Sequence, residues 1–174
     1  MITDNMYLIQ RIINLYGVAV DSQNWSLFDE IFTPDIDALY NENARWSDRA
    51  TIKSDFEAYH DLFDGTQHMM SNHVIDVDGD TAQALTYAHW RLIRKGLPGG
   101  EFWEGNGWYD DTLVRTPNGW RINRRVCKII WWGGNPLVNE TTPGVKFDLP
   151  LTSLRSEAAA GAVAYFRTRP GLTG

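Results

Sequence analysis

The sequence predicts an α+β protein in which three helices precede most of a twisted antiparallel sheet. Two observations support this prediction. Before Gly65, apolar residues recur at helical spacing in three segments, whereas after Gly65 they alternate with a period of about two residues. The later segments are joined by short turns, so neighbouring strands are expected to run antiparallel.

The first two helices each have an apolar stripe that ends at polar or turn residues. The first helix has about four turns and ends in residues 21–24, where Ser22 or Asn24 caps a short second helix. The second helix ends at "TPD", residues 33–35. The two stripes are Leu8, Ile9, Ile12, Ile13, Tyr16 and Val20, followed by Trp25, Phe28, Ile31 and Phe32.

A short strand at about residues 35–40 separates these helices from a third helix, which Ser47 or Asp48 caps and Gly65 ends. The buried stripe of the third helix is Ile52, Phe56, Tyr59 and Phe63. His60 lies outside this stripe, so we expect it on the solvated side of the helix.

Four long strands follow, and the chain then becomes irregular. The strands cover about residues 67–77, 81–94, 101–115 and 120–132. No linker or repeat interrupts the chain, so residues 1–174 are expected to form a single domain. Its core spans about residues 5–135, and residues 133–174 form an irregular C-terminal extension with one last short helix within 153–166.

The composition narrows the class of protein. A length of 174 residues fits one domain, and a net charge of −6 argues against a nucleic-acid partner. No apolar run is long enough to span a membrane, and the N-terminus is a poor signal peptide. Cys127 is the only cysteine, so an internal disulfide is excluded and a cytoplasmic location is expected. Eight tryptophans and seven tyrosines suit a large core or a pocket for a flat apolar ligand.

Two histidines in "TQHMMSNHV" are candidates for chemistry. Strand alternation places His68, Met70 and Asn72 on one face and His73 on the other, unless a bulge intervenes. Each histidine is either a packed imidazole or a catalytic one. Asp21, at the end of the first helix, either caps the next helix or is a buried partner.

Two later strands carry further polar candidates on apolar faces. Arg125 shares a face with Cys127 and Trp131, and a buried guanidinium needs a carboxylate or a ligand oxygen. An ion pair with Asp110 or Asp111 and a contact to a ligand both remain open. Tyr109 and Asp111 share a face with Gly105 and Gly107, which leave space for a ligand or another backbone.

The chain resembles the SnoaL-like branch of the nuclear transport factor 2-like superfamily over about residues 5–135. The resemblance rests on "NLYGVAVDSQNWSLFDEIFTPD", "TQHMMSNHVIDVDGDTAQA" and "DDTLVRTPNGWRINRRV", in this order and spacing. It implies a cone-shaped α+β barrel, in which a curved antiparallel sheet and the N-terminal helices enclose a deep pocket. Members include scytalone dehydratase, bile-acid dehydratase, hexachlorocyclohexane dehydrochlorinase, polyketide cyclases and ketosteroid isomerase.

The resemblance also implies a set of site residues. The histidine–aspartate pair of the dehydratases corresponds to His68 and Asp21, and bile-acid dehydratase adds matches at Tyr16 and Arg125. The tyrosine that assists in scytalone dehydratase corresponds loosely to Tyr40. The second histidine of that enzyme falls at about Arg94, which puts the scytalone reaction itself in doubt. The substrate-binding set expected from the pocket is Tyr40, Tyr109, Met70, Asn72 and Trp131.

The implied activity is a dehydratase-type elimination from a small, hydrophobic, cyclic substrate, with His68 as general base and no metal or organic cofactor. Three alternatives remain: an isomerase or polyketide cyclase with the same pair, a non-catalytic binding protein, and the small subunit of a ring-hydroxylating dioxygenase. We also expect self-association as a dimer or trimer through tryptophans on the strands. These tryptophans are Trp90, Trp103, Trp108, Trp131 and Trp132.

Overall fold

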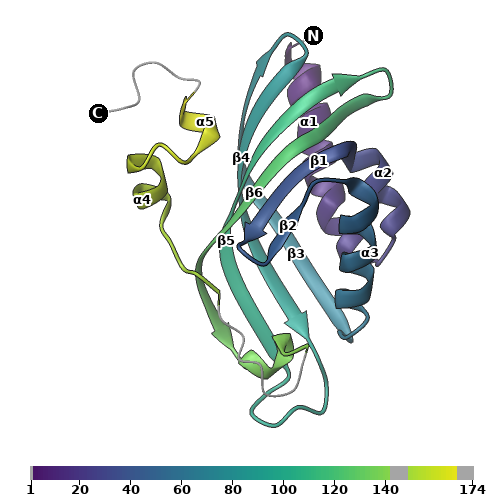
Figure 1. The fold of residues 1–174 in the computed structure, drawn as a ribbon, viewed down its shortest axis with the longest axis vertical. Coiled ribbons are helices and arrows are strands. Elements are labelled where there is room, and N and C mark those ends of the chain that lie inside the picture. Colours follow the sequence, from purple (N-terminus) through teal and green to yellow (C-terminus); the bar gives the residue numbers. More distant parts are fainter. Residues whose placement is uncertain (1, 142–148, 168–174) are drawn as a thin grey trace.

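A computed structural model describes residues 2–141 and 149–167 and confirms the α+β class. One six-stranded sheet has the order β2-β1-β6-β5-β4-β3. The N-terminal helices α1, α2 and α3 cover one face of this sheet, and the C-terminal helices α4 and α5 lie on the other side (Figure 1). The helices are α1 Ile2–Asp21, α2 Phe28–Ile31, α3 Arg49–His60, α4 Leu154–Ala159 and α5 Ala164–Arg167. The strands are β1 Phe32–Asn41, β2 Ala44–Trp46, β3 Gly65–Asp78, β4 Thr81–Ile93, β5 Phe102–Thr116 and β6 Gly119–Gly134.

The sheet differs from the prediction in two ways. It is mixed, because β1 runs parallel to β6 while the other neighbours are antiparallel. It also does not close into a barrel, since β2 and β3 are the two edges. The first strand begins at Phe32 rather than at about residue 35, because Pro34 disfavours the helical conformation at Thr33. This shortens the second helix to a 3-10 turn, Trp25–Leu27, and one turn of α2.

Helix α3 confirms one predicted cap and overturns one predicted exposure. The Asp48 carboxylate accepts a hydrogen bond from the backbone N–H of Thr51 at 2.8 Å. His60 was expected in solvent, but it is only 3% exposed. It continues the stripe of Ile52 and Phe56 at steps of four residues, so it faces the sheet with them.

A bulge in β3, the exception allowed in the prediction of opposite faces, places the two histidines on the same face of the strand. The register with β4 shifts between Ser71 and Val74, and Asn72 in this gap has a φ of 50°. His68 pairs with Trp90 on β4, and the His73 ring lies 3.1 Å from the Thr86 hydroxyl. Trp90 and Thr86 are four residues apart on β4, so both histidines face the helices.

A second bulge, in β6, decides which tryptophan points inward. Ile129 pairs with Gly107 and Trp131 with Asn106, so Ile130 is an extra residue on β6. Beyond the bulge, Trp132 stacks on Trp103 with ring centroids 6.4 Å apart. Trp131 is 44% exposed on the outer face. The expected shared face of Arg125, Cys127 and Trp131 therefore ends before Trp131.

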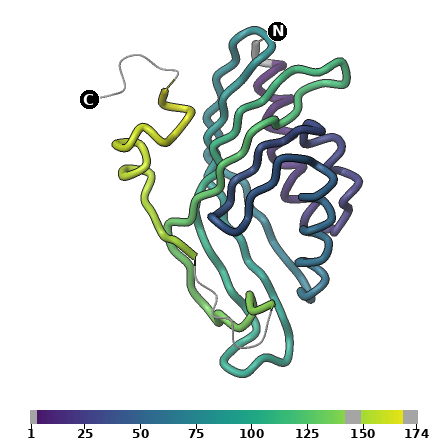
Figure 2. Tube along the Cα trace, viewed as in Figure 1, coloured from purple at the N-terminus to yellow at the C-terminus, as the bar shows by residue number. Residues whose placement is uncertain are grey.

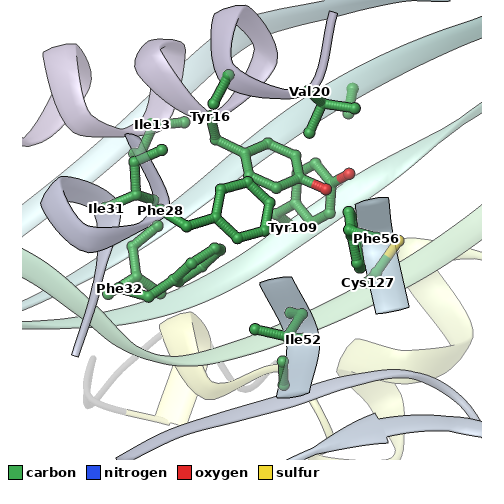
Figure 3. Close-up of a cluster of buried hydrophobic side chains, with 14 of the residues drawn as sticks. Ile13, Tyr16, Val20, Phe28, Ile31, Phe32, Ile52, Phe56, Tyr109 and Cys127 are labelled. Atoms are coloured by element: carbon green, nitrogen blue, oxygen red, sulfur yellow. The ribbon is translucent and has the colours of Figure 1, made fainter. Parts of the chain in front are cut away.

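The main core lies between α1, α2, α3 and the sheet. Figure 3 shows its centre, where rings from the helices meet Tyr109 and Cys127 from the sheet. Trp90 and Trp103 belong to this core, so they offer no surface for self-association. No helix in the described part of the chain has the length and apolar character needed to cross a membrane.

Residues 149–167 of the C-terminal extension run back along the outer face of the sheet (Figure 2). It forms two short helices rather than the single one expected within 153–166. A small apolar cluster lies beneath it, made of Leu85, Trp108, Val163 and Tyr165. The buried Asp110 carboxylate accepts the backbone N–H groups of Ala164 and Tyr165 at 2.6 and 3.1 Å. The extension thus buries Trp108, a third tryptophan expected at the surface.

Candidate functional site

Asp21 and His68 meet at the junction of α1 and β3. One oxygen of Asp21 lies 2.7 Å from His68 Nδ1 and accepts the Thr66 hydroxyl at 2.9 Å. The other oxygen accepts the backbone N–H of His68 at 2.7 Å. Asp21 is therefore a partner of β3 and not a helix cap, which settles the alternative left open by the sequence.

A glycine allows the helix to come this close to the strand. A Cβ at Gly17 would lie 2.9 Å from the carbonyl oxygen of His68, closer than ordinary van der Waals contact. Gly17 is one turn before Asp21 on α1. Its missing side chain therefore sets the spacing at which Asp21 reaches the imidazole.

The hydrogen bonds of Asp21 determine the form of both side chains. Burial raises the pKa of Asp21, but the hydrogen bonds and charge of His68, with the bond from Thr66, outweigh burial and lower it. An ionised carboxylate only accepts hydrogen bonds, so Nδ1 of His68 carries the proton. In the neutral ring, Nε2 of His68 then holds the free lone pair.

His68 lines a cavity of about 540 Å³ between the sheet and the helices. The wall is largely aromatic, and Tyr16, Tyr40 and Tyr109 contribute to it. The hydroxyls of Tyr16 and Tyr40 lie 3.0 Å apart, and the Trp90 indole donates to the Tyr109 hydroxyl at 2.8 Å. Burial raises the pKa of all three tyrosines well above the usual value, so they remain protonated hydrogen-bond donors.

Arg125 lies behind the cavity wall and does not line it. Its side chain is fully buried, and its Nε and Nη2 each donate to Asp111 at 2.8 Å. Its guanidinium carbon lies 4.3 Å from the ring centroid of Tyr16 and 4.1 Å from that of Tyr109. Of the two readings left open, the ion pair with Asp111 is the one that the structure contains.

Three residues expected to bind substrate lie elsewhere. Met70 packs against the core, Asn72 is exposed at the bulge of β3, and Trp131 is exposed beyond the bulge of β6. None of the three lines the cavity. Of the expected substrate-binding set, only Tyr40 and Tyr109 line it.

His60 is one of several lining residues that the sequence did not indicate as part of a site. His60 lines the cavity and its Nδ1 lies 2.7 Å from the Phe56 carbonyl oxygen. Burial lowers its pKa to about 4, so its ring is neutral near pH 7. The signal for His60 was its spacing of four from Phe56.

Asn139 also lines the cavity, from a 3-10 turn, Pro136–Asn139, in the C-terminal extension. The Tyr59 hydroxyl donates to its Oδ1, while its Nδ2 is buried without a partner among the described residues. No spacing in the sequence could have revealed Asn139, because it lies beyond the strands and outside the region of resemblance.

The described side chains of the site were also compared with the ligand sets that hold metal ions. Within the ranges that the structure describes, no group of three or more His, Cys, Asp or Glu side chains is arranged to hold a metal ion.

Solved structures with the same fold include several bacterial proteins. A protein of Kribbella flavida superposes with a TM-score of 0.73 at 18% identity, covering 76% of this chain and 95% of that chain. A candidate scytalone dehydratase of Novosphingobium aromaticivorans has a TM-score of 0.68 at 23% identity, with 75% and 87% covered. LinA has a TM-score of 0.66 at 13% identity, with 85% and 96% covered.

Two comparisons of the amino-acid sequence identify the family of the chain. It is 33% identical over 128 residues to an uncharacterised protein of Mycobacterium tuberculosis, covering 68% of this chain and 80% of that protein. The profile of the SnoaL-like domain matches residues 4–126, which include Tyr16, Asp21, His68 and Arg125. The chain belongs to the SnoaL-like family and has the nuclear transport factor 2-like fold.

Proposed function

We propose that this protein is a cofactor-independent lyase that carries out a dehydratase-type elimination on a small, hydrophobic, cyclic molecule. The observation that supports this most is the Asp21–His68 pair in the wall of an aromatic cavity, beside the hydroxyls of Tyr16 and Tyr40. A base and hydrogen-bond donors are the two elements that an elimination next to a carbonyl group requires. The structurally similar proteins described as a candidate scytalone dehydratase and as LinA are consistent with this class.

The proposed reaction begins with proton removal by His68. Its Nε2 takes a proton from a carbon next to the substrate carbonyl, and the electron pair of that C–H bond moves toward the carbonyl oxygen. Asp21 stabilises the imidazolium that forms, through its bond to Nδ1.

The tyrosine pair stabilises the negative oxygen. Since the hydroxyls of Tyr16 and Tyr40 are 3.0 Å apart, one donates to the other. The hydroxyl that accepts has its own O–H available to donate a hydrogen bond to the substrate oxygen, and it retains its proton throughout the reaction.

The elimination is completed when the carbon–oxygen bond on the neighbouring carbon breaks. The electron pair returns from the oxygen, a carbon–carbon double bond forms, and the imidazolium gives its proton to the leaving hydroxide. Water leaves, and neutral His68 is restored with atoms and charge balanced.

A screen of cyclic β-hydroxy ketones with the intact protein tests this proposal. We expect loss of 18 mass units for a subset of these compounds, and no loss with the His68→Ala variant. A product of unchanged mass with a shifted double bond would indicate an isomerase instead. Binding of these compounds without any change would indicate a non-catalytic binding protein.

A further inference from the structure

A buried ion pair lies directly behind the tyrosines of the cavity. The Arg125 and Asp111 side chains are both 0% exposed and share two hydrogen bonds of 2.8 Å. The guanidinium carbon is 4.1–4.3 Å from the ring centroids of Tyr109 and Tyr16. The cation therefore contacts the faces of two rings that line the cavity.

Stability alone is a weak explanation for this pair. Removing both charges from water is costly, and apolar side chains of similar volume usually serve a core as well. Among the described residues, Arg125 Nη1 has no hydrogen-bond partner, so the ring faces offset part of its burial. Arg125 also cannot bind substrate directly, because it does not line the cavity.

A cation held against a phenol ring makes the hydroxyl a stronger donor. Its positive charge favours electron density on the phenol oxygen, and this effect is large where water is excluded. We propose that Arg125 is a positioning residue that holds and polarises the Tyr16 and Tyr109 hydroxyls toward a substrate oxyanion, while Asp111 limits the charge that they experience. This inference rests on the proposed function, in which tyrosine hydroxyls stabilise a negative oxygen.

The electrostatics of the tyrosines agree with this role. Burial raises the pKa of Tyr16, Tyr40 and Tyr109, whereas the charge of Arg125 acts in the opposite direction on all three. The hydroxyl network passes the effect on, since the hydroxyls of Tyr16 and Tyr40 are 3.0 Å apart.

Binding of 4-nitrophenol to the intact protein tests the inference without any turnover. Its absorbance distinguishes phenol from phenolate, so it reports how well the cavity holds an oxyanion near neutral pH. Two variants change the charge in opposite directions. Asp111→Asn leaves the cation without its counter-charge, and Arg125→Met combined with Asp111→Leu replaces the pair with apolar side chains.

We expect the ratio of bound phenolate to bound phenol to rise about tenfold in Asp111→Asn and to fall about tenfold in the apolar pair. Arg124→Met is the matched control. Arg124 directly precedes Arg125 on β6 and faces outward toward Asp110, so its substitution should leave the ratio unchanged. Melting curves identify variants that fail to fold. If Asp111→Asn does not fold, the apolar pair still decides the question.

Equal ratios in the wild type and the folded apolar pair would overturn the inference and reduce Arg125 to a packing residue. The inference would also be overturned if the ratio of bound phenolate to bound phenol fell in both variants in proportion to their loss of melting temperature. Because the probe needs no reaction, an absence of lyase activity leaves this measurement intact, so the two proposals fail separately.

Discussion

Two histidines line the same cavity, but their surroundings differ. His68 on β3 is bonded through Nδ1 to the Asp21 carboxylate, whereas His60 on α3 is bonded through Nδ1 to the Phe56 carbonyl. A carboxylate carries a full negative charge and stabilises an imidazolium, while a carbonyl carries only a partial charge. Burial lowers the pKa of His60 to about 4. The hydrogen-bond partner and burial, rather than the imidazole itself, separate a candidate base from a neutral wall residue.

The largest expected effect is that of His68→Ala on turnover. If His68 is the general base, kcat falls by about 10²–10⁴-fold, while substrate binding changes much less because the aromatic wall remains. Steady-state kinetics on a substrate found by the screen measure this effect. His73→Ala is the internal control, since His73 faces the same way but bonds Thr86 and does not line the cavity. If His73→Ala abolished turnover and His68→Ala did not, His73 and not His68 would be the general base.

A somewhat smaller loss is expected for Asp21→Asn, which keeps the shape of the side chain but removes its charge. The fold should be retained, and kcat should fall by about 10–10³-fold because the imidazolium loses its counter-charge. The double variant with His68→Ala should be little worse than His68→Ala alone, since the two residues act as a unit. Additive losses in this double-mutant cycle would show that they act independently.

His60 should affect stability rather than turnover, and its effect should depend on pH. Its pKa is about 4 in the folded protein against 6.5 for an ordinary histidine, so the unfolded chain binds the extra proton. The free energy of unfolding is therefore unaffected by the titration of His60 above pH 6.5. It falls by about 3 kcal/mol as the pH drops from 6.5 toward 4. Denaturant unfolding from pH 7 to pH 4 measures it.

Two variants sharpen this contrast. His60→Phe fits the aromatic stripe and should remove the loss of stability between pH 6.5 and 4, while kcat stays near the wild-type value. The lowered pKa of Asp21 contributes stability that is lost only at lower pH, as its carboxylate becomes protonated. Asp21→Asn should therefore keep the His60 transition but move it to slightly lower pH, because the charge of Asp21 raises the pKa of His60. An unchanged pH profile in His60→Phe would contradict the assignment.

The smallest expected effect comes from a wider spacing between Asp21 on α1 and His68 on β3. A Cβ at Gly17 would meet the His68 backbone at 2.9 Å, so Gly17→Ala should push α1 away from β3. We expect a loss of about 1–3 kcal/mol in unfolding free energy and a reduced kcat. Gly65→Ala is a suitable control, since nothing lies within 4 Å of its added Cβ. A wild-type kcat in Gly17→Ala would show that the pair tolerates a wider spacing.

The sequence determined the elements whose signals are local. Apolar residues at helical spacing predict α1 and α3, and Asp48 is a recognisable cap. Asp21 and His68 were identified by their resemblance to a family, and the structure places them 2.7 Å apart. Each of these features depends on neighbours in the chain or on a motif, so it can be read without knowing the pairing of the strands.

The tertiary structure decided what depends on pairing and packing. A single extra residue reverses every side chain beyond it, so the bulges near Asn72 and Ile130 moved His73 inward and Trp131 outward. The sequence left Asp110 and Asp111 as possible ion-pair partners of Arg125. The pairing of β5 with β6 places Asp111 opposite Arg125. Asn139 reaches the cavity from an extension that has no periodic pattern. In each case the deciding contact joins residues far apart in the chain, and only the folded sheet brings them together.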